Sequence, residues 1–481
     1  MTRISELDLS RLSARGARLF PERVAVEQED GSTLTYIELD ELVVRTARTL
    51  TDACLRPGAI VTVRVRGRTA GIIALLAAWR AELTPAPVPW SSPRPYHRAV
   101  VERTRAVAEL EDGPLGVTVR PFRSPSTAPI EPPRAYLMST SGSSGPPKVV
   151  AVGHEALTRH LEGAAATFGY TADDRCLLFH SVGFDAMLEE AFTPLVVGAA
   201  VLDGGASTPT PRAFGASLDQ RGVTVLQLPT PYWRLASQVG ERAASRWSGL
   251  RAVIVGSEAM QPNDVWEWRA RSAFEAVSLF NAYGPTEAVI TSHAALITAD
   301  TDCSNEVPVG TPLPGHEEAL DVDGELQLGG TCLAVGYLDA DVTERGRFRV
   351  VGGRRWYASG DRMLRRSDGA LAFIGRADRQ VQVKGHRVEL SGVESTLLLH
   401  PEVIVARVDL TGTGALRATV ALAAASEATV EELRDHLATH LPAPMVPADI
   451  DVVPASGLTP GWKVQRDTRA AGADRYGRQN N

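Results

Sequence analysis

Short apolar runs alternate with helical patterns along most of the chain before residue 370. Residues Ala252–Val255 form a continuous apolar run, and Val223–Leu228 form a second run that stops at a proline. Runs of this kind are typical of parallel strands buried on both faces. From Phe184 to Leu195 the apolar residues recur at helical spacing. The alternation predicts an α/β fold with mostly parallel sheets and helices, whose ligands bind beyond the C-terminal ends of the strands.

The pattern changes character near Gly375–Asp378. The elements expected beyond it are an alternating segment (Gln380–Glu389), a helix (Ser391–Leu399), two strands (Val403–Leu410 and Arg417–Leu422), a helix (Val430–His440) and a strand (Ile450–Val453). Together they predict a small α+β domain of ordinary size. We therefore expect a large N-terminal domain over residues 1–377, a small C-terminal domain over 378–470 and a disordered tail over 471–481.

Composition narrows the class of protein. The 481 residues carry a formal net charge of -7, which does not favour a nucleic-acid partner, because such proteins normally show a basic stripe. The four cysteines are scattered, which excludes a zinc knuckle or a redox pair and fits a reducing compartment. The polar N-terminus MTRISELDLS lacks the apolar core of a signal peptide, and no apolar run is long enough for a membrane helix. We expect a cytoplasmic protein without a membrane partner.

The stretch Tyr136–Val150 is rich in hydroxyls, glycines and prolines and contains one lysine. Hydroxyls, free backbone amides and a positive charge suit a polyphosphate, although a flexible Ser/Gly linker is the plainer interpretation. It is not a P-loop, because Pro147 precedes the lysine where glycine is required. The residues expected to bind phosphate are Thr140, Ser141, Gly142, Ser143, Ser144, Gly145 and Lys148.

Three more blocks follow in the chain. Asn281–Glu287 supplies an aromatic face, a turn, a hydroxyl and a carboxylate that could hold Mg²⁺. Trp356–Asp361 ends on an aspartate able to accept both ribose hydroxyls, and Gly375–Glu389 is a long polar block. In this order the blocks resemble the adenylate-forming superfamily, and more narrowly a stand-alone amino-acid adenylation domain of nonribosomal peptide synthesis. Leu34–Leu39, Gly324–Leu338 and Leu458–Lys463 resemble further blocks of that family.

The resemblance implies a ligase that uses ATP and Mg²⁺. A carboxylate attacks the α-phosphate to give an acyl-adenylate and pyrophosphate, and the acyl group then passes to a phosphopantetheine thiol. Positioning and charge neutralisation supply most of the catalysis in such phosphoryl chemistry. The family also implies that the small C-terminal domain is mobile, swinging between the two steps about a hinge at Asp378.

The resemblance also implies roles for individual residues. Tyr283 would stack on adenine, Asp361 would hold the ribose and Arg376 would contact the nucleotide. The expected catalytic residues are Thr286 at the α-phosphate, Glu287 on Mg²⁺ and Lys463 between the substrate carboxylate and the phosphate. Gly256, Ser257, Glu258, Asn281, Ala282 and Gly284 complete the expected nucleotide-binding set.

Asp185 matches the family position that binds the α-amino group of an amino acid, which an aryl or fatty acid would leave unpaired. The alternative is that Asp185 only caps the following helix. The other expected pocket residues are Ala186, Glu189, Gln227, Val253, Val255, Ala282, Ile290 and Thr291. Glu189 favours a polar or cationic substrate, unless it is a solvated helix residue beside Glu190.

No carrier-domain signature is present, so the expected acceptor is a separate phosphopantetheinylated carrier protein, or CoA. Many relatives also require a small MbtH-like activator, and the sequence leaves that requirement open for this chain. Two alternatives to the amino-acid enzyme stand: an acyl- or aryl-CoA ligase of the same superfamily, and a non-catalytic adenylate-binding homologue. The last is suggested by Val149 and Trp462, which stand where the family usually has glycine.

Overall fold

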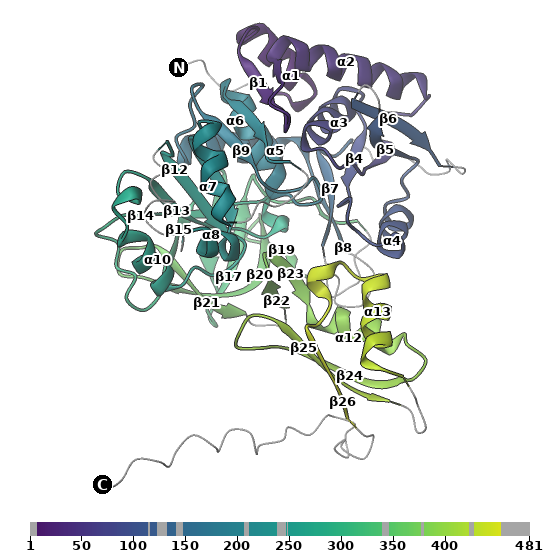
Figure 1. The fold of residues 1–481 in the computed structure, drawn as a ribbon, viewed down its shortest axis with the longest axis vertical. Helices are drawn as coiled ribbons and strands as arrows, with labels where there is room; N and C mark the ends of the chain where they lie inside the picture. Colours follow the sequence, from purple (N-terminus) through teal and green to yellow (C-terminus); the bar gives the residue numbers. More distant parts are fainter. Residues whose placement is uncertain are drawn as a thin grey trace.

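The computed structural model describes residues 7–113, 116–122, 132–140, 148–205, 211–237, 247, 249–338, 346–376, 380–422 and 428–453. One long mixed sheet runs through the larger part of the molecule (Figure 1). Its strands, in spatial order, are β16 (His316–Leu320), β17 (Glu325–Gly330), β20 (Arg354–Arg365), β21 (Leu371–Arg376), β15 (Pro308–Pro312), β14 (His293–Ile297), β13 (Ser278–Tyr283), β12 (Ala252–Gly256), β11 (Val225–Pro229), β9 (Arg175–Leu178), β10 (Ala200–Asp203), β1 (Val24–Glu27) and β2 (Thr33–Thr35), with β19 (Phe348–Val351) paired to β20.

Within this sheet, one block of neighbouring strands is entirely parallel, in the spatial order β1, β10, β9, β11, β12 and β13. Two smaller sheets accompany them. Their strands are β4 (Thr84–Pro87), β3 (Ile60–Val63), β5 (Ala108–Gly113) and β6 (Gly116–Pro121) in one, and β18 (Gly336–Tyr337), β8 (Lys148–Val152) and β7 (Tyr136–Thr140) in the other. The expected α/β class is confirmed, and both expected strands appear, as β11 and β12.

Helices cover the sheets. They are α1 (Leu12–Leu19), α2 (Tyr36–Asp52), α3 (Arg68–Arg80), α4 (Arg94–Thr104), α5 (His154–Thr167), α6 (Ala186–Val197), α7 (Pro211–Gln220), α8 (Thr230–Ser237) and α10 (Pro262–Arg269), with 3-10 turns η1 (Leu9–Arg11), η3 (Ser272–Phe274) and η4 (Thr286–Ala288). Helix α2 begins at a capping box in which Thr35 and Glu38 exchange hydrogen bonds, which explains these two polar positions of the Leu34–Leu39 block. Helix α6 begins directly after Asp185, as the periodicity predicted.

The C-terminal elements have a core of their own. They are the hairpin β22 (Gln380–Val383) and β23 (His386–Glu389), helix α12 (Leu390–Leu398), strands β24 (Val403–Leu410), β25 (Leu416–Leu422) and β26 (Asp449–Val453), helix α13 (Val430–His440) and the turn η5 (Ala443–Met445). Figure 1 shows them below the large sheet, with α13 near α4. The predicted boundary at residue 377 and the predicted tail lie outside the described residues, so these limits stay predictions. Within the described residues, no helix is both long and apolar enough to span a membrane.

Trp79 on α3 lies within the largest core cluster, together with Phe192. Its ring centroid lies 4.7 Å from that of Phe192 on α6, and its indole Nε1 donates a 2.6 Å hydrogen bond to the carbonyl of Ala135. The side chain is fully buried, with 1% of the residue exposed. It therefore fixes α3 against both α6 and the strand that leads to the Ser/Gly-rich stretch.

Replacing Trp79 by alanine should destabilise the protein by about 3–5 kcal/mol, because a large buried aromatic leaves a cavity and an unpaired carbonyl. The measurement is urea unfolding followed by circular dichroism. Trp266→Ala is the matched control, since that tryptophan is 75% exposed and its loss should change stability by about 0.5 kcal/mol or less. Equal shifts for the two variants would contradict this packing role.

Candidate functional site

The loops after three neighbouring parallel strands meet at one edge of the large sheet. Strands β11, β12 and β13 are neighbours in the sheet and end side by side, at Pro229, Gly256 and Tyr283. This edge is where open α/β sheets bind ligands. The loop after β13 is tight: a Cβ on Gly284 would lie 2.1 Å from the carbonyl oxygen of Ile290. Only glycine permits that approach, so this loop holds η4 close against the sheet edge.

Tyr283, Asp361 and Arg376 form one hydrogen-bonded group. The Tyr283 hydroxyl donates to Asp361 Oδ2 at 2.5 Å, and Arg376 Nη1 donates to Asp361 Oδ1 at 2.5 Å. Asp361 and Arg376 lie opposite each other on β20 and β21. Burial, and then the Asp361 charge, raises the pKa of Tyr283, which stays protonated. The three residues expected at adenine, ribose and nucleotide are thus brought together.

Glu287 is a fully buried carboxylate on η4. The Tyr337 hydroxyl donates to its Oε1 at 2.6 Å, and Arg387 Nη1 donates to its Oε2 at 3.0 Å. Burial works to raise the pKa of Glu287, but the Arg387 charge and the Tyr337 hydrogen bond bring it below its usual range. Glu287 is therefore an ionised carboxylate at neutral pH, held between a phenol and a guanidinium.

Lys148 begins β8, opposite Thr140 at the end of β7. Its buried ammonium donates to Glu389 Oε1 at 3.0 Å, and Gln380 hydrogen-bonds the same oxygen. Thr140 and Lys148 flank the rest of the predicted phosphate stretch, because Ser141, Gly142, Ser143, Ser144 and Gly145 lie outside the described residues. The adjacent Val149 packs into an apolar cluster with Ile60 and Leu137, so its side chain serves the core.

The β22–β23 hairpin docks on this edge from the C-terminal part. Its two turn residues, Lys384 and Gly385, both have positive φ, as a two-residue hairpin turn requires. The Gly385 amide donates to Glu258 Oε1 at 2.7 Å. The ring centroid of His386 lies 4.7 Å from that of Phe184, and burial lowers the pKa of His386 to about 4. The hairpin thus brings a neutral imidazole and the charges of Arg387 and Glu389 to the site.

The expected pocket residues divide between two faces of the sheet. The side chains of Gln227 and Ala282 lie on the same face of the sheet as that of Ile254, which was not predicted. Gln227 pairs with Ile254 on the neighbouring strand, and Ile254 shares a core cluster with Ala282. Val253 and Val255 instead pack into the cluster on the opposite face, among tryptophans of α8 and α10. The structure therefore does not bring these two valines together with the other expected pocket residues. Ala186, Ile290 and Thr291 lie beside Asp185 and η4 along the chain.

Asp185 occupies the N-cap position of α6 but makes no side-chain capping hydrogen bond. Its Oδ2 atom is buried and has no hydrogen-bond partner among the described residues. Burial raises the pKa of Asp185, while a hydrogen bond with Thr286 acts in the opposite direction. The capping interpretation is therefore not supported, and an acceptor is left free beside Thr286.

Glu189 lies one turn farther along α6 and is fully buried, so the interpretation as a solvated helix residue is wrong. Its Oε2 is 2.6 Å from His160 Nε2, and its Oε1 accepts a 3.0 Å hydrogen bond from Gln227 Nε2. Sequence reasoning missed His160, although its place on the apolar face of α5, in line with Leu157, Leu161 and Ala164, was a visible signal.

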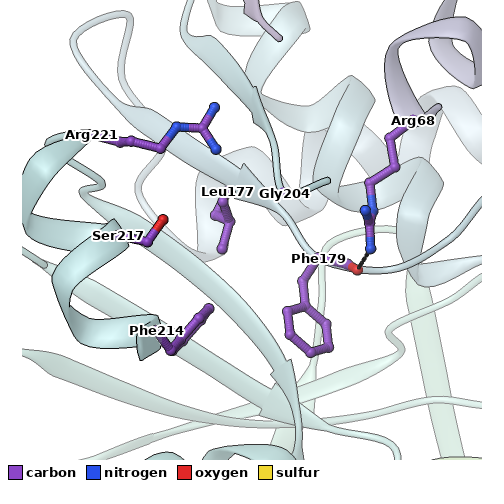
Figure 2. A pocket seen from close by; sticks show the side chains of 7 residues that line it. All are labelled: Arg68, Leu177, Phe179, Gly204, Phe214, Ser217 and Arg221. Atoms are coloured by element: carbon purple, nitrogen blue, oxygen red, sulfur yellow. Dashed lines mark hydrogen bonds between the residues drawn. The ribbon is translucent and has the colours of Figure 1, made fainter. Parts of the chain in front are cut away.

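A small cavity lies elsewhere, between α7 and strands β9 and β10 (Figure 2). Leu177, Phe179 and Phe214 line it, and its two arginines are engaged: Arg68 donates to the carbonyls of Phe179 and His180, and Arg221 donates to Glu27. It holds none of the predicted site residues. Lys463 and Asp378 lie outside the described residues.

Residues 13–338 match the sequence profile of a family described as AMP-binding enzyme. The chain belongs to this family. The chain is 33% identical to the isonitrile lipopeptide synthase of Streptomyces coeruleorubidus, over 93% of its own length and 32% of that protein. It is 31% identical to novobiocin biosynthesis protein H of Streptomyces niveus, over 95% and 81%, and 30% identical to tyrocidine synthase 1 of Brevibacillus parabrevis, over 94% and 44%. It thus spans about a third of the first relative and under half of the third.

Solved structures show the same fold. An artificially fused adenylation–PCP di-domain from Klebsiella oxytoca superposes with a TM-score of 0.80 at 24% identity, over 92% of this chain and 93% of that one. The o-succinylbenzoate CoA synthetase of Bacillus subtilis superposes with a TM-score of 0.80 at 20% identity, over 95% and 97%. The chain therefore has the fold of these adenylate-forming proteins, and its small C-terminal part belongs to that fold.

The donor set of this site fits a magnesium nucleotide. Asp361 offers a carboxylate for a diol, Tyr283 an aromatic ring, Lys148 a buried cation for phosphate and Glu287 an ionised carboxylate for a divalent ion. In this structure the hairpin pairs both charges, through Arg387 and Glu389. A bound nucleotide would have to take the place of these two contacts.

Arg387→Ala should therefore strengthen binding of a magnesium–ATP analogue on the order of tenfold, because the pair to be broken is charge-assisted and worth about 1.5–3 kcal/mol. Isothermal titration without amino acid measures this affinity. The matched control is Arg407→Ala, which removes an exposed ion pair with Asp409 in the same C-terminal part and should leave affinity unchanged. Equal or weaker binding by Arg387→Ala would show that the hairpin does not compete with the nucleotide.

Proposed function

We propose that this chain activates an amino acid with ATP and Mg²⁺ and then transfers it to the phosphopantetheine thiol of a separate carrier protein. The observation that carries the proposal is Asp185, whose buried Oδ2 has no partner among the described residues and whose hydrogen bond with Thr286 joins it to the predicted phosphate site. A buried carboxylate is costly unless a cation pairs with it. The α-ammonium of an amino acid supplies that cation, whereas an aryl or fatty acid does not.

In the first step the substrate carboxylate attacks the α-phosphorus, and the bond to the bridging oxygen of pyrophosphate breaks. Asp185 holds the ammonium so that the carboxylate points toward Thr286, and Lys148 stabilises negative charge on the phosphates. Tyr283 and Asp361 orient the adenosine, and Glu287 would hold Mg²⁺, whose charge offsets that of the phosphates. Lys463 and the residues from Ser141 to Gly145 are proposed partners of the same groups.

In the second step a thiolate attacks the carbonyl carbon of the aminoacyl-adenylate, and the carbon–oxygen bond to AMP breaks. Docking of the β22–β23 hairpin supports this step. Arg387 then pairs with Glu287, which would hold Mg²⁺ in the first step, and Glu389 pairs with Lys148, which would face the phosphates. His386 is neutral and faces Phe184 beside the substrate site. The small C-terminal domain, with Asp378 as hinge, would thus serve both steps in two positions. We propose a cytoplasmic location, and an MbtH-like activator as an optional partner.

Amino-acid-dependent exchange of pyrophosphate into ATP tests the proposal. One amino acid should drive exchange, and Asp185→Asn should reduce kcat/KM by about a hundredfold or more, because a buried charge-assisted contact is lost. Glu190→Gln is the control, since that neighbouring buried carboxylate binds the backbone amides of Phe179 and His180 instead. Exchange with benzoate or a fatty acid alone would make the chain a CoA ligase, and nucleotide binding without any exchange would make it a non-catalytic homologue.

The pH dependence of amino-acid binding should report Asp185. Since burial raises the pKa of this carboxyl, it takes up a proton at a higher pH than an exposed aspartate, and the ammonium loses its partner. The KM for the amino acid should therefore rise on acidification before the KM for ATP does. In Asp185→Asn the amino-acid KM should be high and flat across the same range. Parallel changes of both KM values in the wild type would assign the titration to another group.

A further inference from the structure

Four buried polar side chains form a cluster around Glu189, one turn along α6 from Asp185. Glu189 comes from α6, His160 from α5, Gln227 from β11 and His316 from the start of β16. The rings of His160 and His316 pack edge to face, with centroids 5.9 Å apart. Such clusters are stable only when nearly all their polar atoms are hydrogen-bonded. Here several atoms have no partner among the described residues: His160 Nδ1, both ring nitrogens of His316 and Gln227 Oε1.

The hydrogen bonds of Glu189 determine which atom of Gln227 is free. A carboxylate only accepts hydrogen bonds, so the amide nitrogen of Gln227 must face Glu189 Oε1, as it does at 3.0 Å. The free atom of the amide is then its oxygen, which is buried. A buried carbonyl oxygen needs a donor, and no described side chain supplies one. Among the described residues, Gln227 Oε1 therefore lacks a hydrogen-bond donor.

His160 decides whether that donor should carry a charge. Its Nε2 lies 2.6 Å from Glu189 Oε2, and both side chains are completely buried. Both oxygens of Glu189 are thus engaged, Oε2 by His160 and Oε1 by Gln227, so neither is left for an ammonium group. An imidazole can also carry a positive charge, which an amide cannot. His316 is neutral, because burial lowers its pKa to about 2, and it adds no charge. The cluster thus favours a neutral donor over an ammonium group.

The position of the cluster links it to the proposed substrate site. Asp185, at the N-cap, and Glu189 are four residues apart, so they lie on the same face of α6, about 6 Å apart along its axis. The Tyr136 hydroxyl is also buried without a partner among the described residues, and the charges of Asp185, Glu287 and Glu189 all act on it. The side chain of an amino acid held at Asp185 can therefore extend along α6 toward Glu189 and its partner Gln227.

We propose that the amino acid has a short, neutral side chain ending in a hydroxyl or carboxamide that donates to Gln227 Oε1, and that His160 is the positioning residue that makes the site prefer it to a diamino acid. This rests on the proposed function and chooses between the polar and cationic substrates that the sequence left open. His160 acts through Glu189 and does not contact the substrate.

Pyrophosphate exchange with three matched sets of substrates tests the proposal. The neutral donors are serine, threonine, homoserine, asparagine and glutamine. Their apolar isosteres, in the same order, are 2-aminobutyrate, valine, norvaline, leucine and homoleucine. The cations are 2,3-diaminopropionate, 2,4-diaminobutyrate and ornithine. One neutral donor should exceed both its isostere and its cationic counterpart by about tenfold or more in kcat/KM. A wild-type preference for a cation or an isostere overturns the inference but leaves the proposed function standing. Silence with every amino acid, with and without an MbtH-like activator, overturns both.

Two variants separate the role of His160 from packing. His160→Gln keeps a hydrogen-bond donor near Glu189 but cannot share a positive charge, so the ratio of diamino to neutral kcat/KM should rise about tenfold or more. His293→Gln is the matched control, because His293 is a second buried histidine, 2.7 Å from Glu318, and its loss should not change that ratio. Gln227→Leu should instead remove the preference for the donor over its apolar isostere. Unchanged ratios in a folded His160→Gln protein would overturn the role of His160.

Discussion

The buried charge of Glu287 is the constraint on which the site depends. A carboxylate removed from water must be compensated, and the fold brings Tyr337 and Arg387 to it from two distant strands. The turn that presents it is followed by Val289 and Ile290, both with positive φ, a strained conformation for β-branched residues. Backbone strain of this kind persists only where the surrounding structure enforces it. The ion pair with Arg387 also holds the C-terminal hairpin against the large sheet.

Compensation of buried charge also connects the two proposed steps. Lys148 and Glu287 have opposite charges and lie in the large domain, and the hairpin supplies a counter-charge to each. A magnesium nucleotide carries the same two counter-charges. Exchange between these two sets of partners would let one site alternate between two chemistries without leaving a buried charge unpaired. The conformational change would then be driven by charge compensation rather than by a large change in apolar contact.

Much of this arrangement could be predicted from the sequence. Strand β24 and helix α13 have the predicted limits, because alternation and periodicity there are undisturbed. The blocks around Tyr283, Asp361 and Arg376 converge as expected. The side on which Val253 and Val255 lie could not be predicted, because a strand buried on both faces shows no alternation of polar and apolar residues. The partners of Glu189 depend on contacts between α5, α6 and β11, which local pattern does not contain.

In the proposed reaction, the carboxylate of an amino acid attacks the α-phosphate of ATP. The most direct test labels both carboxylate oxygens of the exchanging amino acid with heavy oxygen and releases the product with hydroxylamine, which breaks the bond between carbon and oxygen. Mass spectrometry of the AMP should then find a single heavy oxygen. Unlabelled AMP, or label in ADP or inorganic phosphate instead, would contradict formation of an aminoacyl-adenylate.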